Sequence, residues 1–558
     1  MTSAERVRPF RCEGRISMVA RSPRNLFALI VLLGAYATAA FLVATRPGAT
    51  LSADERTVIR LAHWQIEAGP REAIDAVIAR YEELNPAVRV EQVTVPGSLF
   101  KQWLRTQLIG GNATDIIEFG SFWGGVNDIP PRFFDPITRE VEAPNHYNRG
   151  TSLEGVPWRD TFRDGLNTPD AYIENLSNYF AVTLTMTTMR AFYNPELLLA
   201  ITGSAKPPTS YREVRELTIK LADYNQRTGQ KVTLYAGSQF TGETLMIDRI
   251  TTYSGLGLSM YNDRFREQGT KPRDSTLEYL RGRWNFDHPA LRDALELARE
   301  GAAGMRPGFQ QLGREAAVQE FMRSQTVMII TGTWDATSLR KLAPFELTVE
   351  EFPWPKQGDG KFTDESWGPY SEGAGGTTAA FYLNKASQHK EVALDFMRFM
   401  TSVEGNGIFV EKSGWLPSVR EVEVPDYAKA YMPHFAGYSA RLSIMRGYGN
   451  ETRDVWSRQL HRLISPNGSV DSFLEAFRPE FREALVRDLQ TDLRNVYLSL
   501  RRDLAPLTAL AMLDLLEDGD AHRESSRRDR ESSQTIIEAK LYEAEFVLPL
   551  GPAMNTLP

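Results

Sequence analysis

Large aromatic side chains lie at or just beyond the ends of several predicted strands in this sequence. Trp64, Phe119 and Trp334 each follow an apolar run of strand type. Further tryptophans lie in predicted loops or near turns: Trp123, Trp158, Trp367, Trp415 and Trp456. Aromatic faces suit the C–H faces of sugar rings, while neighbouring polar groups can bind hydroxyls. Because any single indole is more simply explained by packing, the prediction of carbohydrate binding depends on their collective placement.

The stretch VMIITGTWDA, residues 327–336, shows this pattern most clearly. Four apolar residues predict a buried strand, Thr331-Gly332-Thr333 ends it, and Trp334 and Asp335 follow. A tryptophan placed only for packing would be expected within the apolar run. Since α/β sheets receive ligands where their strands end, we expect the backbone to turn at residues 331–333 and Trp334 to form part of a binding wall.

Other chemistries find little support in the sequence. The seven histidines stand apart, without an H-E-x-x-H motif or a pair at metal-ligand spacing, so we expect no transition-metal site. Neither a G-x-S-x-G elbow nor a Walker loop occurs, and we expect no cofactor. Glycoside hydrolysis needs two carboxylates about 5 to 9.5 Å apart, a distance that a sequence does not show. Carboxylates are plentiful, and they include Glu67, Asp115, Glu118, Asp335 and Glu372.

The composition is that of a soluble globular protein of several domains. The chain has 558 residues, of which 42% are hydrophobic and 24% are charged, and no long low-complexity tract. Its formal net charge of -7 and pI near 5.7 give no basic footprint for nucleic acid, so we expect no nucleic-acid partner.

The N-terminal segment predicts export. Residues 26–44 carry no charge and as a helix would span roughly 28 Å, enough to cross a hydrocarbon core. Six arginines precede them, so residues 1–25 are expected in the cytoplasm and the large body outside it, in the periplasm or at the cell surface. Because Ala37-Thr38-Ala39 is a possible cleavage site, the segment 26–45 is either a signal peptide or a transmembrane anchor to the inner membrane. Cys12, the only cysteine, precedes it, which excludes disulfides from the exported body.

Strands and helices alternate along the remaining chain. Residues 57–64 and 88–95 alternate as strands around a helical stripe at 70–84, which predicts a strand–helix–strand unit with parallel strands. An irregular insertion follows at 122–178, and a second α/β unit begins near 179. The later expected elements are helices at roughly 242–255, 288–301 and 313–323, a strand at 326–330, a mostly helical stretch at 452–515 and a solvated segment at 518–534.

In this order the segments resemble the extracellular solute-binding proteins of ABC importers, specifically the carbohydrate-binding family that includes maltose-binding protein. The resemblance extends from about residue 57 to about residue 500. Its marks are HWQIEAGPREAIDAVIARYEELNP, GGNATDIIEF, AFYNPELL with PPTSYREV, VMIITGTW after EAAVQEFMRS, and LNKASQHKEVALDFMRFMTSVEGNGIFVEKSGWLPS. The chain departs from the family in lacking a lipoprotein cysteine, in the insertion at 122–178 and in the tail beyond residue 500.

The resemblance implies two α/β lobes joined by a hinge, with the ligand in the cleft between them. The first lobe would comprise 57–180 and 338–400, the second 183–334 and 401–500, and residues 501–558 would be a C-terminal extension. Matched residue by residue, the implied ligand contacts are Trp64, Glu67 and Phe119 in the first lobe, Thr183 at a crossing, Trp334 where the chain returns, and Trp456 as a C-terminal aromatic. Asp335, Trp123 and Trp367 are added from their position alone.

The expected function is therefore that of a receptor, not an enzyme. It would capture a carbohydrate, in particular an oligosaccharide, by lobe closure and deliver it as a monomer to the permease subunits of an ABC importer. Two alternatives remain: a secreted carbohydrate-active enzyme, and an anchored sugar-sensing receptor.

Overall fold

The computed structural model describes residues 56–66, 69–120, 129–173, 176, 178–254, 272–372, 377–434, 436–439, 449–516 and 521–545. The predictions for residues 1–25 and 26–45, and for Glu67 and Trp123, lie outside these residues. The helices found within these ranges are all too short or too polar to cross a lipid bilayer. The description below concerns the compact unit that begins at Thr57.

The first lobe is built around a six-stranded mixed sheet. Its strands, in spatial order, are β13 (Leu416–Pro417), β6 (Ala181–Met186), β12 (Thr377–Leu383), β3 (Ile116–Glu118), β1 (Thr57–His63) and β2 (Val88–Thr94). β1 is parallel to both β2 and β3, whereas β12 is antiparallel to β3 and β6. The predicted strand–helix–strand unit is therefore confirmed.

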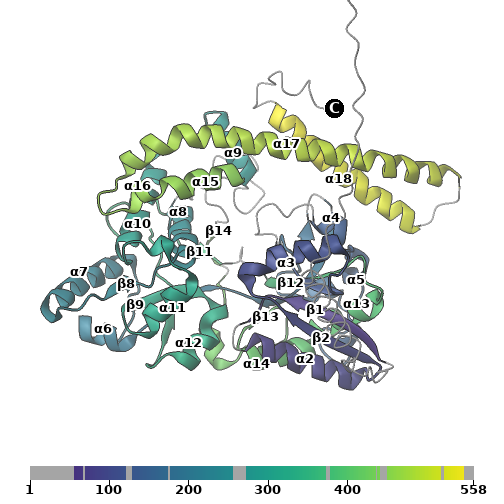
Figure 1. Cartoon of the computed structure of the whole chain (residues 1–558), viewed down its shortest axis with the longest axis horizontal. Helices are drawn as coiled ribbons and strands as arrows, with labels where there is room; N and C mark the ends of the chain where they lie inside the picture. The colour runs from purple at the N-terminus through teal and green to yellow at the C-terminus, as the bar shows by residue number, and fades with distance from the viewer. Residues whose placement is uncertain are drawn as a thin grey trace, which may run out of the picture. The chain divides into compact units, whose positions relative to one another are not determined.

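Helices cover both faces of the first sheet (Figure 1). α2 (Pro70–Leu84) begins with a proline in its first turn, where the missing N–H has no helical partner to lose. Its buried residues Ile74, Val77, Ile78 and Tyr81 recur at helical spacing and pack with α13 (Lys390–Met400) and α14 (Val403–Ser413). α3 (Gly97–Gly110) packs on the opposite face.

The second lobe contains a four-stranded sheet in the order β10 (Thr348–Glu350), β7 (Met189–Tyr193), β9 (Thr326–Gly332) and β8 (Thr233–Tyr235). β8 and β9 are parallel, and β7 is antiparallel to both β9 and β10. One face is covered by α6 (Pro195–Thr202), α7 (Tyr211–Thr228), α8 (Asp248–Ser254) and α10 (Pro289–Ala303), and the other by α11 (Arg314–Met322) and α12 (Ala336–Leu342). The helices expected near 288–301 and 313–323 are confirmed as α10 and α11.

The lobe boundaries differ from those expected. β10 pairs with β7, and Phe352, Trp354 and Tyr370 belong to the second-lobe core, although residues 338–400 were assigned to the first lobe. Conversely, α14 and β13 pack with the first lobe, although they follow residue 400. The hydrophobic pattern predicts that a strand exists, but it does not show which sheet that strand joins.

The described part of the insertion at 122–178 contributes to the first-lobe core. Trp158, Phe162 and Leu166 are fully buried there. The indole N–H of Trp158 donates a hydrogen bond of 3.0 Å to the hydroxyl of Thr401, next to the end of α13. Trp158 therefore has a packing role.

Two long helices form the C-terminal part. α17 (Val470–Leu516) contacts α15 (Asn450–Gln459) and α16 (His461–Ile464), and its far half pairs with α18 (Ala521–Glu545) (Figure 1). Residues 518–534 are predicted to form a solvated segment, and from Ala521 onward this segment is helical, as part of α18. The i,i+4 pairs Arg527–Glu531 and Arg528–Glu524 favour this helix although it contains few apolar residues.

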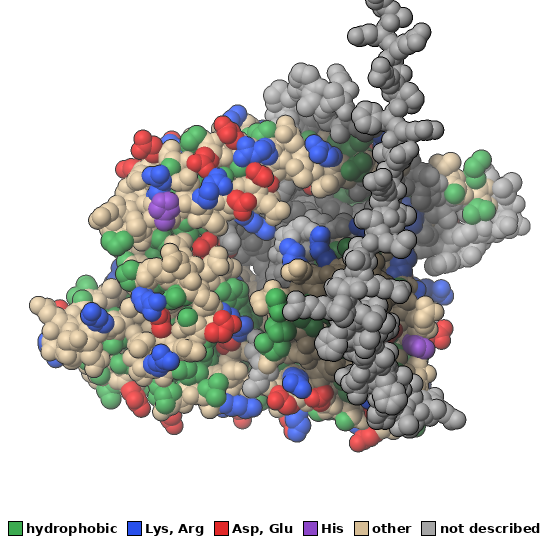
Figure 2. Space-filling view, viewed as in Figure 1, with side chains coloured by type: hydrophobic (Ala, Val, Ile, Leu, Met, Phe, Trp, Pro, Cys, Tyr) green, Lys and Arg blue, Asp and Glu red, His purple; other side chains and the backbone are tan. Residues whose placement is uncertain are grey.

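Figure 2 shows one face of the molecule, on which side chains of both signs are intermixed over the described surface. Exposed ion pairs such as Arg292–Asp471 and Arg478–Asp287 connect neighbouring helices and loops. Such pairs contribute little stability. The described surface in this view forms no continuous basic patch of the kind that binds nucleic acid.

Candidate functional site

Two aromatic rings meet where the parallel strands β8 and β9 end. After β8 the chain enters the π-helix η4 (Gln239–Ile247), which is capped by the hydroxyl of Ser238. After β9 it enters the short 3-10 helix η7 (Thr333–Asp335). These connections bring Phe240 and Trp334 together, with ring centroids 6.2 Å apart. Both side chains are partly exposed, so they form an aromatic surface at the edge where α/β sheets receive ligands.

Gly332 provides the space for the indole of Trp334. A Cβ atom at Gly332 would lie 2.2 Å from that ring, far inside van der Waals contact. The backbone of Gly332 is extended, with φ -77° and ψ 159°, so the glycine is needed for room and not for an unusual conformation. The turn itself is made by residues 333–335. Trp334 also packs against the hydrophobic cores of both lobes, which places it at their boundary.

Asp335 is held by internal partners beside this aromatic surface. Its side chain is 7% exposed, accepts a hydrogen bond of 2.6 Å from the hydroxyl of Thr331, and forms an ion pair with Arg314. The guanidinium of Arg314 lies 5.9 Å from the centroid of Phe240, within cation–π range. Arg314 therefore places a cation beside the aromatic pair, and it remains partly accessible to solvent.

The corresponding strand ends of the first lobe present Trp64 and Gln65. The ring of Trp64 contacts that of Phe100 edge to face, with centroids 5.2 Å apart. Glu118, fully buried at the end of β3, accepts hydrogen bonds from the backbone N–H of Trp64 at 3.1 Å and from the side-chain amide of Gln65 at 2.5 Å. The carboxylate thus fixes the loop that leaves β1, and Trp64 and Gln65 stay partly exposed.

His63 precedes this loop and is buried in its neutral form. Burial lowers the pKa of His63 to about 4, against a smaller opposing effect of its bond to Gln92. Nδ1 accepts a hydrogen bond of 3.2 Å from the backbone N–H of Gln65, so Nε2 carries the proton and donates to the side-chain oxygen of Gln92 at 2.5 Å. The imidazole is a fixed element of the loop and not a candidate acid or base near pH 7.

Three predicted site residues are enclosed by protein. Phe119 is 1% exposed and contacts the rings of Phe134 and Tyr382. Thr183 is fully buried, with its hydroxyl 2.6 Å from that of Thr377. Trp456 is 1% exposed, and Phe473 and Phe477 of α17 pack edge to face against it. A ligand could reach none of these without rearrangement, so their burial assigns them a packing role in this structure. Trp415, at 3% exposure, is likewise a core residue.

The structure therefore gathers only some of the predicted residues. Trp334 and Asp335 lie together at the edge of the second sheet, Trp64 lies at the strand ends of the first, and Trp367 is partly buried against the second-lobe core. Sequence reasoning missed Phe240 and Arg314. The strand TLY before Ser238 is only three residues long, so its alternation was too short to identify Phe240 as a strand-end residue. Nothing in the local sequence indicates that Arg314 lies beside Asp335.

A buried ion pair lies beside the connection between the two sheets. Arg190, near the start of β7, donates to Glu372 through two nitrogens at 2.7 and 3.1 Å, and both side chains are less than a tenth exposed. The same guanidinium donates to the backbone carbonyls of Ala430 at 2.8 Å and Met432 at 2.7 Å. One side chain thus joins three chain segments close to the point where residues 187 and 188 connect the two sheets.

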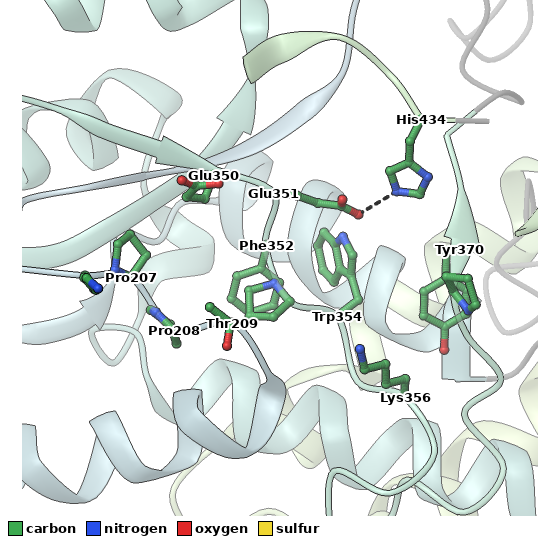
Figure 3. A pocket seen from close by; sticks show the side chains of 13 residues that line it. Pro207, Pro208, Thr209, Glu350, Glu351, Phe352, Trp354, Lys356, Tyr370 and His434 are labelled. Atoms are coloured by element: carbon green, nitrogen blue, oxygen red, sulfur yellow. Dashed lines mark hydrogen bonds and ion pairs between the residues drawn. The ribbon is translucent and has the colours of Figure 1, made fainter. Parts of the chain in front are cut away.

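A pocket of about 500 Å³ opens beside the edge strand β10 of the second lobe (Figure 3). It is lined by residues 206–209, 350–354, Lys356, 369–370 and His434, and it includes none of the predicted site residues. On its rim, His434 lies 2.9 Å from the carboxylate of Glu351. Partial burial lowers the pKa of His434, but the bond and charge of Glu351 and the charge of Glu372 raise it above its ordinary value on balance.

Within the ranges that the structure describes, no three His, Cys, Asp or Glu side chains are grouped closely enough to hold a metal ion. The polar groups of the site instead suit hydrogen bonding to a ligand, and the rings suit contact with its apolar faces.

Comparison with known proteins places the chain in a family. The model for the bacterial extracellular solute-binding proteins matches residues 76–434, which is more than half of the chain. Its description agrees with the extracytoplasmic location expected from the N-terminal charge pattern. A search of curated protein sequences finds no match.

Solved structures share the fold. A chitin oligosaccharide binding protein superimposes with a TM-score of 0.53 at 13% identity, covering 77% of this chain and 100% of its own. A binding protein for cyclic alpha-maltosyl-1,6-maltose from Arthrobacter globiformis gives 0.52 at 17%, covering 77% and 99%. The GacH receptor of Streptomyces glaucescens, solved with acarbose, gives 0.51 at 15%, covering 77% and 98%. At such identities the likeness establishes the two-lobed α/β fold. The chain belongs to the bacterial extracellular solute-binding protein family.

Proposed function

We propose that the protein is an extracytoplasmic receptor that captures an oligosaccharide between its lobes and delivers it to an ABC importer. The observation that carries this proposal is the pair Phe240 and Trp334 at the carboxyl ends of β8 and β9. Trp334 contacts the cores of both lobes, so a sugar on this pair would lie where the lobes meet.

The proposed contacts divide the ligand between apolar and polar groups. The rings of Trp334 and Phe240 would stack on the C–H faces of the sugar, and Arg314 would donate to its hydroxyls or ring oxygens. Trp64 and Gln65 would approach from the first lobe. Trp367 is a further proposed contact, from the second lobe. Glu67 and Trp123 are proposed contacts on the sequence prediction alone. Only a closed form lets both lobes touch one ligand, and this differential contact favours closure.

Three structural relatives carry names that match this ligand class. They bind a chitin oligosaccharide, a cyclic maltosyl-maltose and acarbose respectively, each according to its own description. These descriptions support the choice of an oligosaccharide over other solutes. Delivery to permease subunits as a monomer remains part of the proposal.

We further propose that the protein breaks no bond in its ligand. Four of the carboxylates named in the sequence analysis hold structural hydrogen bonds. Glu118 and Glu372 are engaged as described above, Asp335 pairs with Arg314, and Asp115 accepts from the backbone of Arg60 and the hydroxyl of Ser387. The structural bonds of these carboxylates argue against the alternative that the protein is a carbohydrate-active enzyme. Release of free sugar from oligosaccharides by the purified protein would support that alternative.

The direct test is a thermal-shift screen against monosaccharides and oligosaccharides. A ligand that binds only the native state raises the melting temperature, by an amount that grows with its concentration relative to Kd. We expect oligosaccharides to stabilise the protein, and Trp334→Ala to weaken this effect without unfolding the chain. A screen in which no sugar shifts the transition would overturn the proposed ligand class.

The role of residues 26–45 as signal or anchor decides between a diffusing receptor and the anchored sensory receptor. Fractionation of expressing cells, with mass measurement of the mature chain, distinguishes the two. A mature chain that begins after residue 39 indicates cleavage.

A further inference from the structure

The pocket beside β10 has a rigid aromatic floor. Phe352, Trp354 and Tyr370 are all less than a tenth exposed, and all three belong to the second-lobe core. Tyr370 stacks on Tyr253 with centroids 4.1 Å apart, Trp354 meets Phe352 edge to face at 4.8 Å, and the Tyr370 hydroxyl donates to the carbonyl of Pro355 at 2.8 Å. The floor is therefore preorganised, which reduces the entropy lost when a ligand binds.

Proline residues form the side walls of the pocket. Pro207 and Pro208 enter from the connection between α6 and α7, and Pro353 and Pro369 from the segment that follows β10. Because the proline ring fixes φ, these walls have little freedom to collapse into the space. The volume of about 500 Å³ lies within the range of about 300 to 1,000 Å³ that is typical of small-molecule sites.

The rim carries opposite charges on opposite sides. Figure 3 shows Glu350 and Glu351 on one side of Trp354 and Lys356 on the other. Lys206 adds a second ammonium group to the lining. All four of these side chains are exposed and so can reorient toward a ligand.

The charges of Glu350, Glu351, Lys206 and Lys356 sum to zero, so these four side chains favour neither an anion nor a cation by net charge. A neutral molecule with many hydroxyls can use both signs, because a hydroxyl can donate to a carboxylate and accept from an ammonium group. The apolar floor and walls add contacts suited to C–H groups.

We propose that this pocket is a second carbohydrate site, separate from the site at the lobe boundary and sized for one or two sugar rings. The inference rests on the proposed carbohydrate binding and adds a site to it. All of its lining residues differ from Trp334, Phe240 and Arg314. The two sites can therefore be removed independently.

The test is isothermal titration calorimetry of the full chain with maltotriose and with chitotriose. Lys356→Trp should fill the pocket with an indole from an exposed rim position, and Lys220→Trp, on the exposed face of α7, is the matched control. The double variant Lys206→Ala/Lys356→Ala removes the ammonium donors without adding bulk, with Lys220→Ala/Lys231→Ala as its control for charge.

We expect two binding sites in the wild-type chain. Lys356→Trp should abolish the pocket site and leave the other site unchanged. Lys206→Ala/Lys356→Ala should raise the Kd of the pocket for sugar by about tenfold. The two Lys220 controls should retain both sites. Trp334→Ala should weaken binding only at the other site. A single site that is lost in Lys356→Trp and kept in Trp334→Ala would support the pocket and remove the site at the lobe boundary.

Three results would overturn the inference. A single site that is weakened in Trp334→Ala and unchanged in Lys356→Trp, or two sites that Lys356→Trp leaves intact, would refute the pocket alone and leave the proposed function standing. No binding of any sugar to the wild-type chain would refute both.

Discussion

The indole of Trp334 lies over Gly332, so close that a methyl group on that glycine would sit 2.2 Å from the ring. The last residue of β9 is thus a glycine because the side chain two residues later folds back over it. The partly exposed ring that we assign to ligand binding depends on a residue that itself touches no ligand.

Gly332→Ala is therefore expected to displace Trp334. The added methyl must move the ring, and overpacking of this kind costs about 1 to 3 kcal/mol of stability. We expect a lower melting temperature and weaker sugar binding, measured by thermal shift and calorimetry. The control is Gly407→Ala in α14, where a Cβ meets no atom within 4 Å and a helical alanine should be neutral or stabilising. Unchanged affinity and stability in Gly332→Ala would refute the proposed dependence.

The contributions of Phe240 and Trp334 to the free energy of sugar binding should be coupled. Each single alanine variant is expected to weaken sugar binding, and the double variant to lose less than the sum, with a coupling of about 0.5 to 1.5 kcal/mol. The measurement is a double-mutant cycle by calorimetry. Leu199→Ala, at an exposed position of α6, controls for the loss of an apolar surface side chain. Strict additivity would mean that the two rings contact different ligands or none.

The buried pair Arg190 and Glu372 should be the electrostatic interaction whose loss costs the most stability. Arg190→Met leaves the carboxylate of Glu372 buried and removes the donors to the carbonyls of Ala430 and Met432, so we expect a loss of about 3 to 5 kcal/mol in urea unfolding. Lys429→Met, which breaks the fully exposed pair with Asp426, should change little.

Adding Glu372→Met to Arg190→Met separates charge from packing. The second substitution removes the uncompensated carboxylate, so the double variant is expected to regain part of the lost stability. A double variant less stable than the single one would show that the Glu372 carboxylate, which accepts from the backbone N–H of His434 at 3.2 Å, stabilises the fold even without Arg190.

His63 should make the protein less stable in mild acid. Burial lowers its pKa to about 4 from an ordinary value of 6.5, so the unfolded chain binds more protons between these values. Stability is then complete above pH 6.5 and falls as the pH drops toward 4, with a loss of about 2 kcal/mol at pH 5. His63→Asn, whose side-chain oxygen can replace Nδ1 as acceptor, should lose less stability between pH 7.5 and pH 5 in urea unfolding. An equal loss in both proteins would assign the acid sensitivity to other groups.

The sequence was sufficient to predict the elements whose hydrophobic period is long. The unit from β1 to β2, the helices α10 and α11, and the strand that leads to Trp334 all follow from local patterns, because each buries one regular face. The two-lobed fold followed from the resemblance of ordered segments.

The burial of individual rings could not be predicted in the same way. Phe119 follows β3 as expected, but Phe134 and Tyr382, which enclose it, come from distant segments. Trp456 is covered by Phe473 and Phe477 of α17, a helix whose placement the local pattern does not give. The pocket beside β10 was missed because the walls formed by Pro207 and Pro208 come from a segment more than 100 residues before its aromatic floor.

The long helix α17 has a mechanical consequence. Its first part supplies Phe473, Phe477 and Phe481 to the second-lobe core, whereas beyond Leu493 its main partner is α18. At 47 residues it extends for about 70 Å. In the lobe closure proposed above, a small rotation of the second lobe would therefore move the far end of this helix, where Met512 is 61% exposed, over a much larger distance.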